Sequence, residues 1–202
     1  MLRSSKMIWD NKTPGIPDEF FLREEEVPIT KEEVRSIVIS KLRLKETNSV
    51  IDIGCGSGSI TVELCLQCQK GKVFGVDLDL QAVNLTKKNL EQFKVYAEIK
   101  QGDAMDILES LPFVDGIVIG GTTGRTEELI DRSINKLNNG GRLVITTILI
   151  ETMYKAMKTV NESNLLEDID FTQIIISKGR RTKTGTMLLA RNPVLVISAT
   201  KK

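Results

Sequence analysis

Short apolar runs alternate along the chain with longer segments whose apolar positions recur at helical spacing. The runs predict strands over 49–53, 72–76, 95–100, 115–119 and 142–149, and the segments predict helices over 60–68, 81–93, 126–137 and 151–160. Continuous apolar runs are typical of strands that are buried on both faces. This alternation predicts an α/β fold, with a parallel sheet covered by helices on both faces.

The N-terminal part lacks this pattern. Residues 1–29 contain four interruptions by proline or glycine, so we expect an N-terminal extension or lid there and one domain over 30–202. Thr30 and Glu33 form a capping-box sequence, which predicts that a helix opens at Thr30 and continues over 34–42. We expect Thr30 to serve as the N-cap of this helix.

The last third is rich in β-forming residues. Strands are predicted over 171–177 and 186–191, joined by the charged turn KGRRTKTG, with a further strand over 194–199. The sheet is therefore expected to end in an antiparallel hairpin. Residues 138–141 (NNGG) are expected to stop the preceding helix.

Composition excludes several classes of function. The 202 residues include 28 Lys and Arg, 27 Asp and Glu, and no histidine, which gives a net charge of +1. This balance shows no general basic surface for nucleic acid, and the lack of histidine excludes Ser-His-Asp and HExxH chemistry. No apolar run is long enough for a membrane span and the N-terminus lacks a signal-peptide core, so we expect a cytoplasmic protein.

Three cysteines are present. Cys65 and Cys68 form a lone CxxC, which we interpret as two small buried residues on one helix, because zinc would need two further ligands. Redox activity of this pair is the alternative, but it lacks an active-site context.

The sharpest motif follows the first predicted strand of the sheet. Gly54, Cys55, Gly56, Ser57 and Gly58 form a GxGxG turn between that strand and a helix. Its glycines allow positive φ angles and a close approach of the backbone to a ligand. Ligands of such sheets bind at the carboxyl ends of the strands, where the strand order reverses.

Two carboxylates end the following strands. Asp77 is placed to accept hydrogen bonds from ribose hydroxyls, and Asp103 is placed to reach an adenine amino group. Together with the glycine turn they resemble class I S-adenosylmethionine-dependent methyltransferases over about residues 45–199. This resemblance implies a Rossmann-like, mostly parallel seven-stranded sheet with a C-terminal antiparallel hairpin, and S-adenosyl-L-methionine as cofactor.

Further segments indicate one family. They are GIPDEFF (15–21), ITKEEVR (29–35), GG (120–121), TILIET (147–152), GTM (185–187) and ARNPV (190–194). These segments resemble the precorrin-8w decarboxylases, the decarboxylating cobalt-precorrin-6B C15-methyltransferases of cobalamin biosynthesis. The resemblance implies a cobalt-precorrin tetrapyrrole substrate, methylation at C15 with decarboxylation of the C12 acetate, and a homotetramer. It also implies cofactor contacts from Thr30, Gly54–Gly58, Asp77 and Ala104. One departure is the TTGR sequence at 122–125, where a smaller Ser/Gly-rich run is expected.

A tetrapyrrole with many carboxylates requires positive charge and hydrogen-bond donors. Arg180 and Arg181 lie in the basic run at 178–183, which is either a solvated turn or a carboxylate clamp. Backbone N–H groups of Gly120, Gly121 and Thr122 are candidates for binding another carboxylate. Glu151 is the candidate catalytic residue, for substrate orientation or proton handling; the alternative is a carboxylate favoured by the helix dipole.

Other functions remain open at this point. An RNA adenine-N1 methyltransferase would have a similar architecture but a more extended basic surface. A non-catalytic S-adenosylmethionine-binding module would keep the cofactor motifs without turnover. A nicotinamide dehydrogenase is disfavoured by Ser59, which stands where the GxGxxG fingerprint has glycine. Association with a separate C5-methyltransferase is also left open.

Overall fold

The computed structural model describes residues 9–202, so residues 1–8 of the predicted extension lie outside the described part of the chain. The main sheet contains β1 (Val50–Ile53), β2 (Val73–Asp77), β3 (Glu98–Gln101), β4 (Val114–Ile119), β5 (Leu137–Thr147), β6 (Leu166–Ile174) and β9 (Val194–Lys201). The helices are η1 (Asp18–Phe20), α1 (Glu32–Leu42), α2 (Ser59–Gln67), α3 (Leu80–Phe93), α4 (Ala104–Ser110), α5 (Thr126–Lys136) and α6 (Ile150–Glu162).

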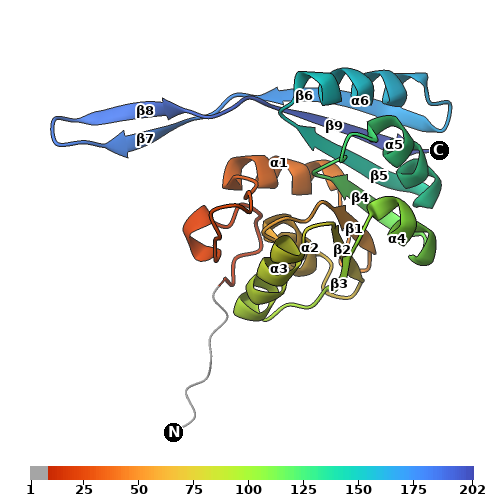
Figure 1. The fold of residues 1–202 in the computed structure, drawn as a ribbon, viewed down its shortest axis with the longest axis horizontal. Coiled ribbons are helices and arrows are strands. Elements are labelled where there is room, and N and C mark those ends of the chain that lie inside the picture. The colour runs from red at the N-terminus through yellow and green to blue at the C-terminus, as the bar shows by residue number, and fades with distance from the viewer. Residues whose placement is uncertain (1–8) are drawn as a thin grey trace, which may run out of the picture.

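The strands follow the order β3-β2-β1-β4-β5-β9-β6 (Figure 1). Strands β1 to β5 pair in parallel, and β9 runs antiparallel to both β5 and β6. The predicted seven-stranded, mostly parallel sheet with an antiparallel end is therefore confirmed. The chain leaves β1 towards β2 and β3 and then returns to β4 on the other side of β1. This reversal of strand order is where an α/β sheet opens a crevice for a ligand.

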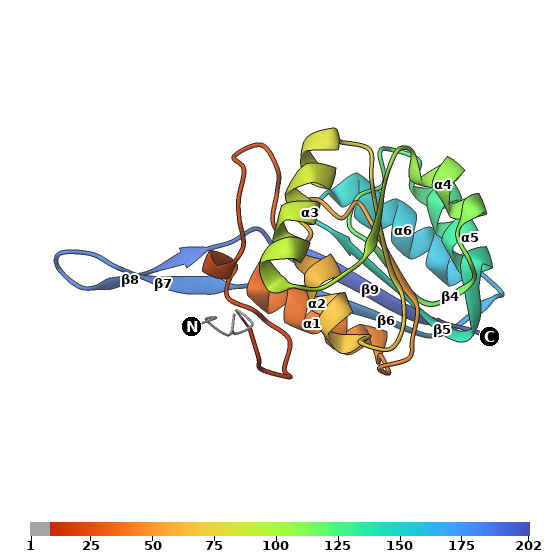
Figure 2. The ribbon, with the colours of Figure 1, turned by 90° about the horizontal axis from the view of Figure 1, so that it is seen from below.

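Helices cover both faces of the sheet, as predicted (Figure 2). Helices α4, α5 and α6 pack over one apolar cluster, which includes Ile51 and Ile53 of β1. Helices α1, α2 and α3 pack over a second cluster, which includes Val50. Neighbouring β1 residues thus point to opposite faces, and all four are buried. Burial on both faces explains the continuous apolar run in the sequence.

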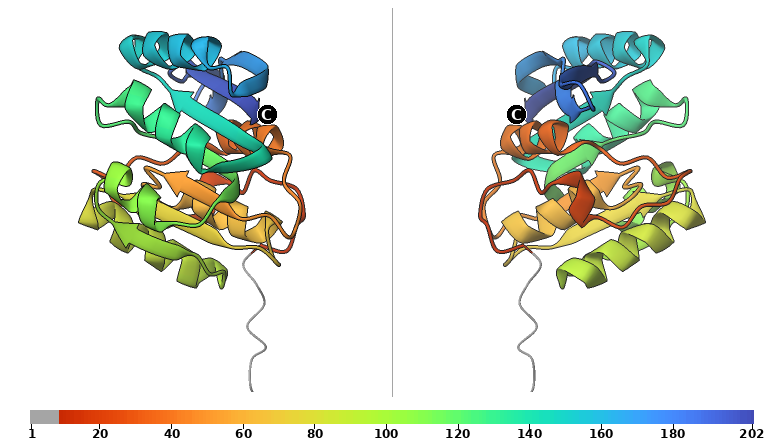
Figure 3. Two further views of the ribbon diagram at one scale, coloured as in Figure 1. Left: turned by 90° about the vertical axis from the view of Figure 1, so that its right-hand side faces the viewer. Right: turned by 90° about the vertical axis from the view of Figure 1, so that its left-hand side faces the viewer.

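The segment before α1 is tied to the body by a buried arginine. Arg35 has no exposed surface; its guanidinium bonds to Asp18 (2.9 Å), to Glu63 (3.0 Å) and to the backbone carbonyls of Ile16 and Thr30. The right-hand view in Figure 3 shows this segment, in red, running across one end of the molecule. The buried ion pairs therefore hold the N-terminal segment in a defined position.

The predicted capping box is wrong. Helix α1 begins at Glu32, with Lys31 at the N-cap position and no side-chain cap. A residue 14 positions earlier in the chain binds its first free amide instead. The Glu32 N–H donates to Asp18 Oδ1 (3.0 Å), and the Asp18 N–H donates to Glu32 Oε2 (3.1 Å). The Thr30 carbonyl accepts from Arg35 instead. Long-range bonds to Asp18 thus replaced the local cap that the sequence pattern favoured.

Between β3 and β5 the structure differs from the prediction in two ways. Helix α4 has no counterpart among the predicted elements; the Asp103 side chain caps it by accepting from the Met105 N–H (2.8 Å). Residues 138–141, expected to stop a helix, belong to β5, which starts directly after α5 at Leu137. Pairing of Leu137 with Val114 of β4 extends the strand back through this polar stretch.

The charged segment forms an arm. Strands β7 (Ser177–Arg181) and β8 (Thr186–Ala190) pair as a separate two-stranded sheet that projects from the body (Figure 1). The predicted strand over 171–177 is split between β6 and β7, and the basic residues 178–181, predicted as a turn, are in β7. The actual turn is shorter: the Thr182 N–H donates to the Gly185 carbonyl (2.7 Å).

The arm starts at the same end of the sheet as the ligand crevice. Thr147 at the end of β5 pairs with Leu195, and Ile174 at the end of β6 pairs with Val194. The carboxyl ends of the parallel strands and the base of the arm therefore share one end of the molecule. This placement brings residues of the last third next to the glycine turn.

Within residues 9–202, no helix has both the length and the apolar character that a membrane span needs. The same residues contain no group of three or more Cys, Asp or Glu side chains that could hold a metal ion together. All three cysteines are buried and outside any disulfide, which agrees with the interpretation of Cys65 and Cys68 as small core residues.

Candidate active site

The glycine turn follows β1 at the reversal of strand order. Gly54, Gly56 and Gly58 have φ angles of 72°, 56° and 76°. A Cβ on Gly54 would lie 2.9 Å from the Gly121 nitrogen, and a Cβ on Gly58 would lie 2.8 Å from the Thr86 Cα. Side chains are excluded at both positions by conformation and by space. The turn can therefore bring bare backbone against a ligand.

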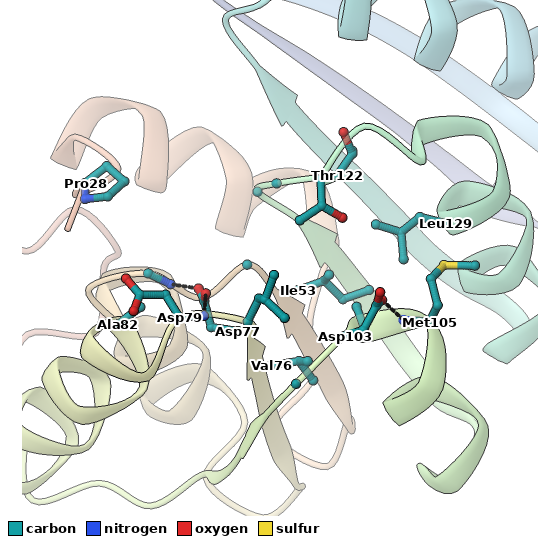
Figure 4. Close-up of a pocket in the computed structure, with 18 of the residues that line it drawn as sticks. Pro28, Ile53, Val76, Asp77, Asp79, Ala82, Asp103, Met105, Thr122 and Leu129 are labelled. Atoms are coloured by element: carbon teal, nitrogen blue, oxygen red, sulfur yellow. Dashed lines mark hydrogen bonds between the residues drawn. The ribbon is translucent and has the colours of Figure 1, made fainter. Parts of the chain in front are cut away.

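A first cavity of about 280 Å³ lies beside this turn at the ends of β1, β2 and β4. In Figure 4, Asp77 and Asp79 lie on one side of it, Asp103 and Met105 on the other, and Ile53 between them. The cofactor candidates in its wall are Gly54, Gly56, Asp77, Asp103 and Ala104, together with the substrate candidates Gly120, Gly121 and Thr122.

Both predicted carboxylates also have structural partners. Asp77 accepts from the Gly56 N–H (2.8 Å) and the Asp79 N–H (3.0 Å), so it holds the glycine turn against β2. Asp103 caps α4 and pairs with Arg125 at 3.4 Å. A carboxylate has about four acceptor positions, so these bonds leave room for ligand hydroxyl or amino groups.

A further carboxyl group lies beneath the turn. Asp52 of β1 is buried and accepts from Thr61 Oγ1 (2.6 Å), while its Oδ1 has no hydrogen-bond partner. Burial raises the pKa of Asp52 to about 7, and the negative charge of Asp77 adds to this effect. The interior next to the first cavity therefore disfavours additional negative charge.

A second cavity, of about 560 Å³, adjoins the first and shares Pro28, Gly54, Gly56 and Gly120 with it. Its wall comes from five distant parts of the chain, at 28–34, 54–60, 120, 146–148 and 190–194. Three cofactor candidates lie here: Thr30, Cys55 and Ser57. The residues predicted for the cofactor site are thus distributed over two adjoining cavities.

Four predicted site residues lie outside both cavity walls. Gly58 is one of them, and its role is to allow the turn into α2. Glu151 is exposed in the first turn of α6, beyond the carboxyl end of β5. Arg180 and Arg181 are exposed in β7, where they pair with Met187 and Thr186 near the turn of the arm.

Two cationic residues in the second cavity were not predicted. Lys31 follows Thr30, and Arg191 follows β8 where the arm returns to the sheet. The signal for Arg191 was available, because it belongs to the ARNPV segment at 190–194. Its proximity to the glycine turn depends on the return of the chain from the arm, which the residue pattern does not reveal.

The two cavities differ in charge. Among the described residues, the charged ones in the first wall are all acidic: Asp77, Asp79 and Asp103. Those in the second wall are both basic, Lys31 and Arg191. The first cavity suits a ligand with hydroxyl, amino or cationic groups, and the second suits an anion.

Sequence comparison identifies relatives of the whole chain. A family profile described as precorrin methyltransferase domain matches residues 20–201. A protein of Saccharolobus solfataricus named probable cobalt-precorrin-6B C(15)-methyltransferase (decarboxylating) is 44% identical over 199 residues, covering 96% of this chain and 100% of that protein.

Solved structures give the same result. The precorrin-8w decarboxylase of Methanobacterium thermoautotrophicum superposes with a TM-score of 0.86 at 32% identity, over 93% of this chain and 100% of that one. A SAM-dependent O-methyltransferase of Thermotoga maritima has a TM-score of 0.72 at 21% identity, covering 88% of this chain and 68% of that one. The latter likeness concerns the fold alone and confirms the class I methyltransferase architecture.

Proposed function

The chain belongs to the precorrin methyltransferase family, and from this premise we propose that it methylates C15 of cobalt-precorrin-6B and decarboxylates the C12 acetate. The observation that carries the proposal is that two adjoining cavities have charged wall residues of opposite sign. The two walls share Gly54 and Gly120. One cavity accommodates a cationic cofactor and the other an anionic ring. Methyl transfer between two ligands needs such adjoining sites.

S-adenosyl-L-methionine fits the first cavity and the glycine turn. Gly54 and Gly56 present backbone without side chains, and Asp77 and Asp103 offer acceptors for ribose hydroxyls and an adenine amino group. Thr30, Cys55, Ser57 and Ala104 complete the proposed contacts. When bound, this cofactor supplies a methyl group on a positively charged sulfur. The acidic wall suits that charge.

The residues of this chain have to align the ligands and exclude water, because the cofactor already carries a good leaving group and the ring supplies the nucleophilic carbon. In the decarboxylation, the bond to the acetate carboxylate breaks, CO₂ leaves and the electron pair enters the conjugated ring. The former acetate carbon then takes up a proton. Neither reaction requires histidine. We propose that Glu151, at the rim beyond β5, orients the ring or handles this proton.

The described part of the N-terminal segment, residues 9–29, acts as a lid in this proposal. Val27 lines the first cavity and Pro28 lines both, so the end of this segment contributes to the wall at their junction. The buried Arg35 bonds hold the segment in place. A tethered segment at the junction would keep water away from the transferring methyl group.

We further propose a cytoplasmic homotetramer, and the arm supports the assembly. Leu188 is 72% exposed, and Met187 and Ile175 are also exposed on the arm or at its base. Apolar side chains gathered on a projecting element are typical of protein contact surfaces. Light scattering after size-exclusion chromatography should give four times the 22.5 kDa chain mass. The three unpaired cysteines agree with a reducing compartment.

The proposal is tested by mass spectrometry after incubation with cobalt-precorrin-6B and S-adenosylmethionine. We expect a product that has gained one methyl group and lost CO₂, and no methylated product when the cofactor is omitted. Cofactor binding without any change in substrate mass would instead indicate a binding module. Methylation of RNA with no action on the tetrapyrrole would favour the RNA methyltransferase alternative.

The clamp proposed for Arg180 and Arg181 has its own test. Replacing both by alanine should raise the KM for the tetrapyrrole while leaving cofactor affinity near the wild-type value, because both side chains are remote from the first cavity. Steady-state kinetics and cofactor calorimetry provide the two measurements. An unchanged KM would contradict the clamp.

A further inference from the structure

We propose that Arg191 and Lys31 form a carboxylate-binding pair in the second cavity, which anchors an acidic side chain of the tetrapyrrole. This inference rests on the proposed function and specifies how the same site holds its substrate. Both residues line the wall of the second cavity. Lys31 is the N-cap residue of α1, and Arg191 directly follows β8, so regular elements position both backbones.

Arg191 has no salt-bridge partner among the described residues, although its positive charge helps to lower the pKa of Glu33. Its Nε is buried and has no hydrogen-bond partner, and its guanidinium forms no ion pair with another described residue. Its backbone N–H donates to the Ile176 carbonyl (2.9 Å), which fixes the base of the arm. A buried donor of this kind is costly unless a ligand satisfies it. A guanidinium binds a carboxylate through two parallel hydrogen bonds.

Lys31 adds a second positive charge to the same wall. The pKa of Lys31 is lowered, mainly by burial. The charges of Arg23 and Arg191 contribute to this lowering, and the Asp18 carboxylate, at 3.7 Å, opposes it. Lys31 and Arg191 line the same cavity and are close enough for the charge of Arg191 to contribute to the lowered pKa of Lys31. A carboxylate between them would relieve the repulsion between their charges.

The acidic residues of this region pair with other cations, and only the Oε2 atom of Glu33 is buried without a hydrogen-bond partner. Asp18 is shared by Arg23, Lys31 and Arg35, and Lys178 of the arm bonds to both Glu32 and Glu33. None of these acidic residues lines the second cavity, whose charged wall residues are Lys31 and Arg191. Its remaining lining includes Val34, Ile60 and Val194, which provide apolar contact for a conjugated ring. This combination matches a flat apolar molecule with acidic side chains.

The test uses Arg191→Gln, Arg191→Lys and Lys31→Gln, with Arg43→Gln as a matched control at the far end of α1, outside both cavity walls. Two probes are titrated: cobalt-precorrin-6B, and uroporphyrin, a stable tetrapyrrole with acetate and propionate side chains. Arg191→Gln should raise the Kd of both by about 10- to 100-fold, as expected for hydrogen bonds to a charged group. Arg191→Lys should recover part of the loss, and Lys31→Gln should show a smaller one.

Three readouts separate binding from folding and from the proposed function. The Kd of S-adenosylmethionine should stay near wild type in every variant, which shows that the fold and the first cavity are intact. The methyl ester of uroporphyrin should bind wild type weakly and show no further loss in Arg191→Gln. Equal tetrapyrrole affinity of wild type and Arg191→Gln would overturn the carboxylate pair even if wild type is active. A wild-type protein that neither binds nor converts cobalt-precorrin-6B would overturn the proposed function and the pair with it.

Discussion

The two cavities of this protein are neighbours, yet they are built in different ways. The first is formed by turns that follow consecutive parallel strands, so Gly54, Asp77 and Asp103 occupy equivalent places in a repeated strand-helix unit. The second combines the segment before α1, the glycine turn, the end of β5 and the return from the arm. It has no repeating origin, and its shape depends on contacts between distant segments.

If the first cavity binds the cofactor and the second the methyl acceptor, as proposed, this difference explains how one fold can serve many acceptors. A cofactor site placed by the order of strands is kept as long as the sheet is kept. A substrate site assembled from an N-terminal segment and a C-terminal arm can change without disturbing the sheet. In this chain the division is also electrostatic, because the walls carry opposite charges that meet at Gly54 and Gly120.

The largest effect is expected from Arg35→Met, which breaks the attachment of the N-terminal segment. The change leaves the buried Glu63 without its cation and removes one of the three cations that pair with Asp18, so the free energy of unfolding should fall by about 3–5 kcal/mol. Chemical denaturation measures it. In the folded fraction, tetrapyrrole affinity should fall more than cofactor affinity, because the segment contributes more to the second cavity.

Arg132→Met is the matched control, since Arg132 also pairs with two carboxylates but on the partly exposed surface of α5. Its effect on unfolding should be far smaller. Equal losses in the two variants would show that the buried network has no special part in holding the second cavity together.

An intermediate effect is expected from Asp77→Ala, which acts on the first cavity. The change removes the acceptor for the Gly56 N–H and the proposed ribose hydroxyls, so the Kd of S-adenosylmethionine should rise by about 10- to 100-fold. Uroporphyrin affinity should change little. Calorimetry with both ligands tests the separation, and Asp106→Ala, an exposed carboxylate of α4 outside both walls, is the control. Wild-type cofactor affinity in Asp77→Ala would contradict its assignment.

The smallest effect concerns Asp52, beneath the turn that the cavities share. Its pKa is about 7 in the folded protein and 3.8 in the reference state, so the neutral form is favoured on folding. This contribution is complete below about pH 4 and is lost as the pH rises through about 7. Relative to Asp52→Asn, wild type should therefore lose on the order of 1 kcal/mol of stability between pH 6 and 7.

Unfolding experiments at several pH values test this, and Asp106→Asn, at an exposed position of α4, is measured in parallel as a surface control. A constant stability difference between wild type and Asp52→Asn would mean that the carboxyl group is not titrating in this range. The interior beneath the glycine turn would then tolerate a negative charge on Asp52 better than the raised pKa of this residue indicates.

Much of the fold was predictable because the physical signals are local. Buried parallel strands produce apolar runs, and amphipathic helices produce the spacing of α3 and α5. The errors occurred where distant residues replaced local ones. Asp18 caps α1 in place of Thr30, and β4 extends β5 back to Leu137. Helix α4 was missed because its short length gives little periodic signal.

The composition and motifs of the chain determine the sheet, the glycine turn and the carboxylates at the strand ends, since strand order alone places these groups together. The tertiary structure decides the rest of the site. It moves Arg180 and Arg181 onto an arm, pairs Lys178 with the first turn of α1, and leaves Arg191 and Lys31 in the second cavity. The physical reason is that charge complementarity across more than a hundred residues depends on where the folded chain returns, which no local pattern records.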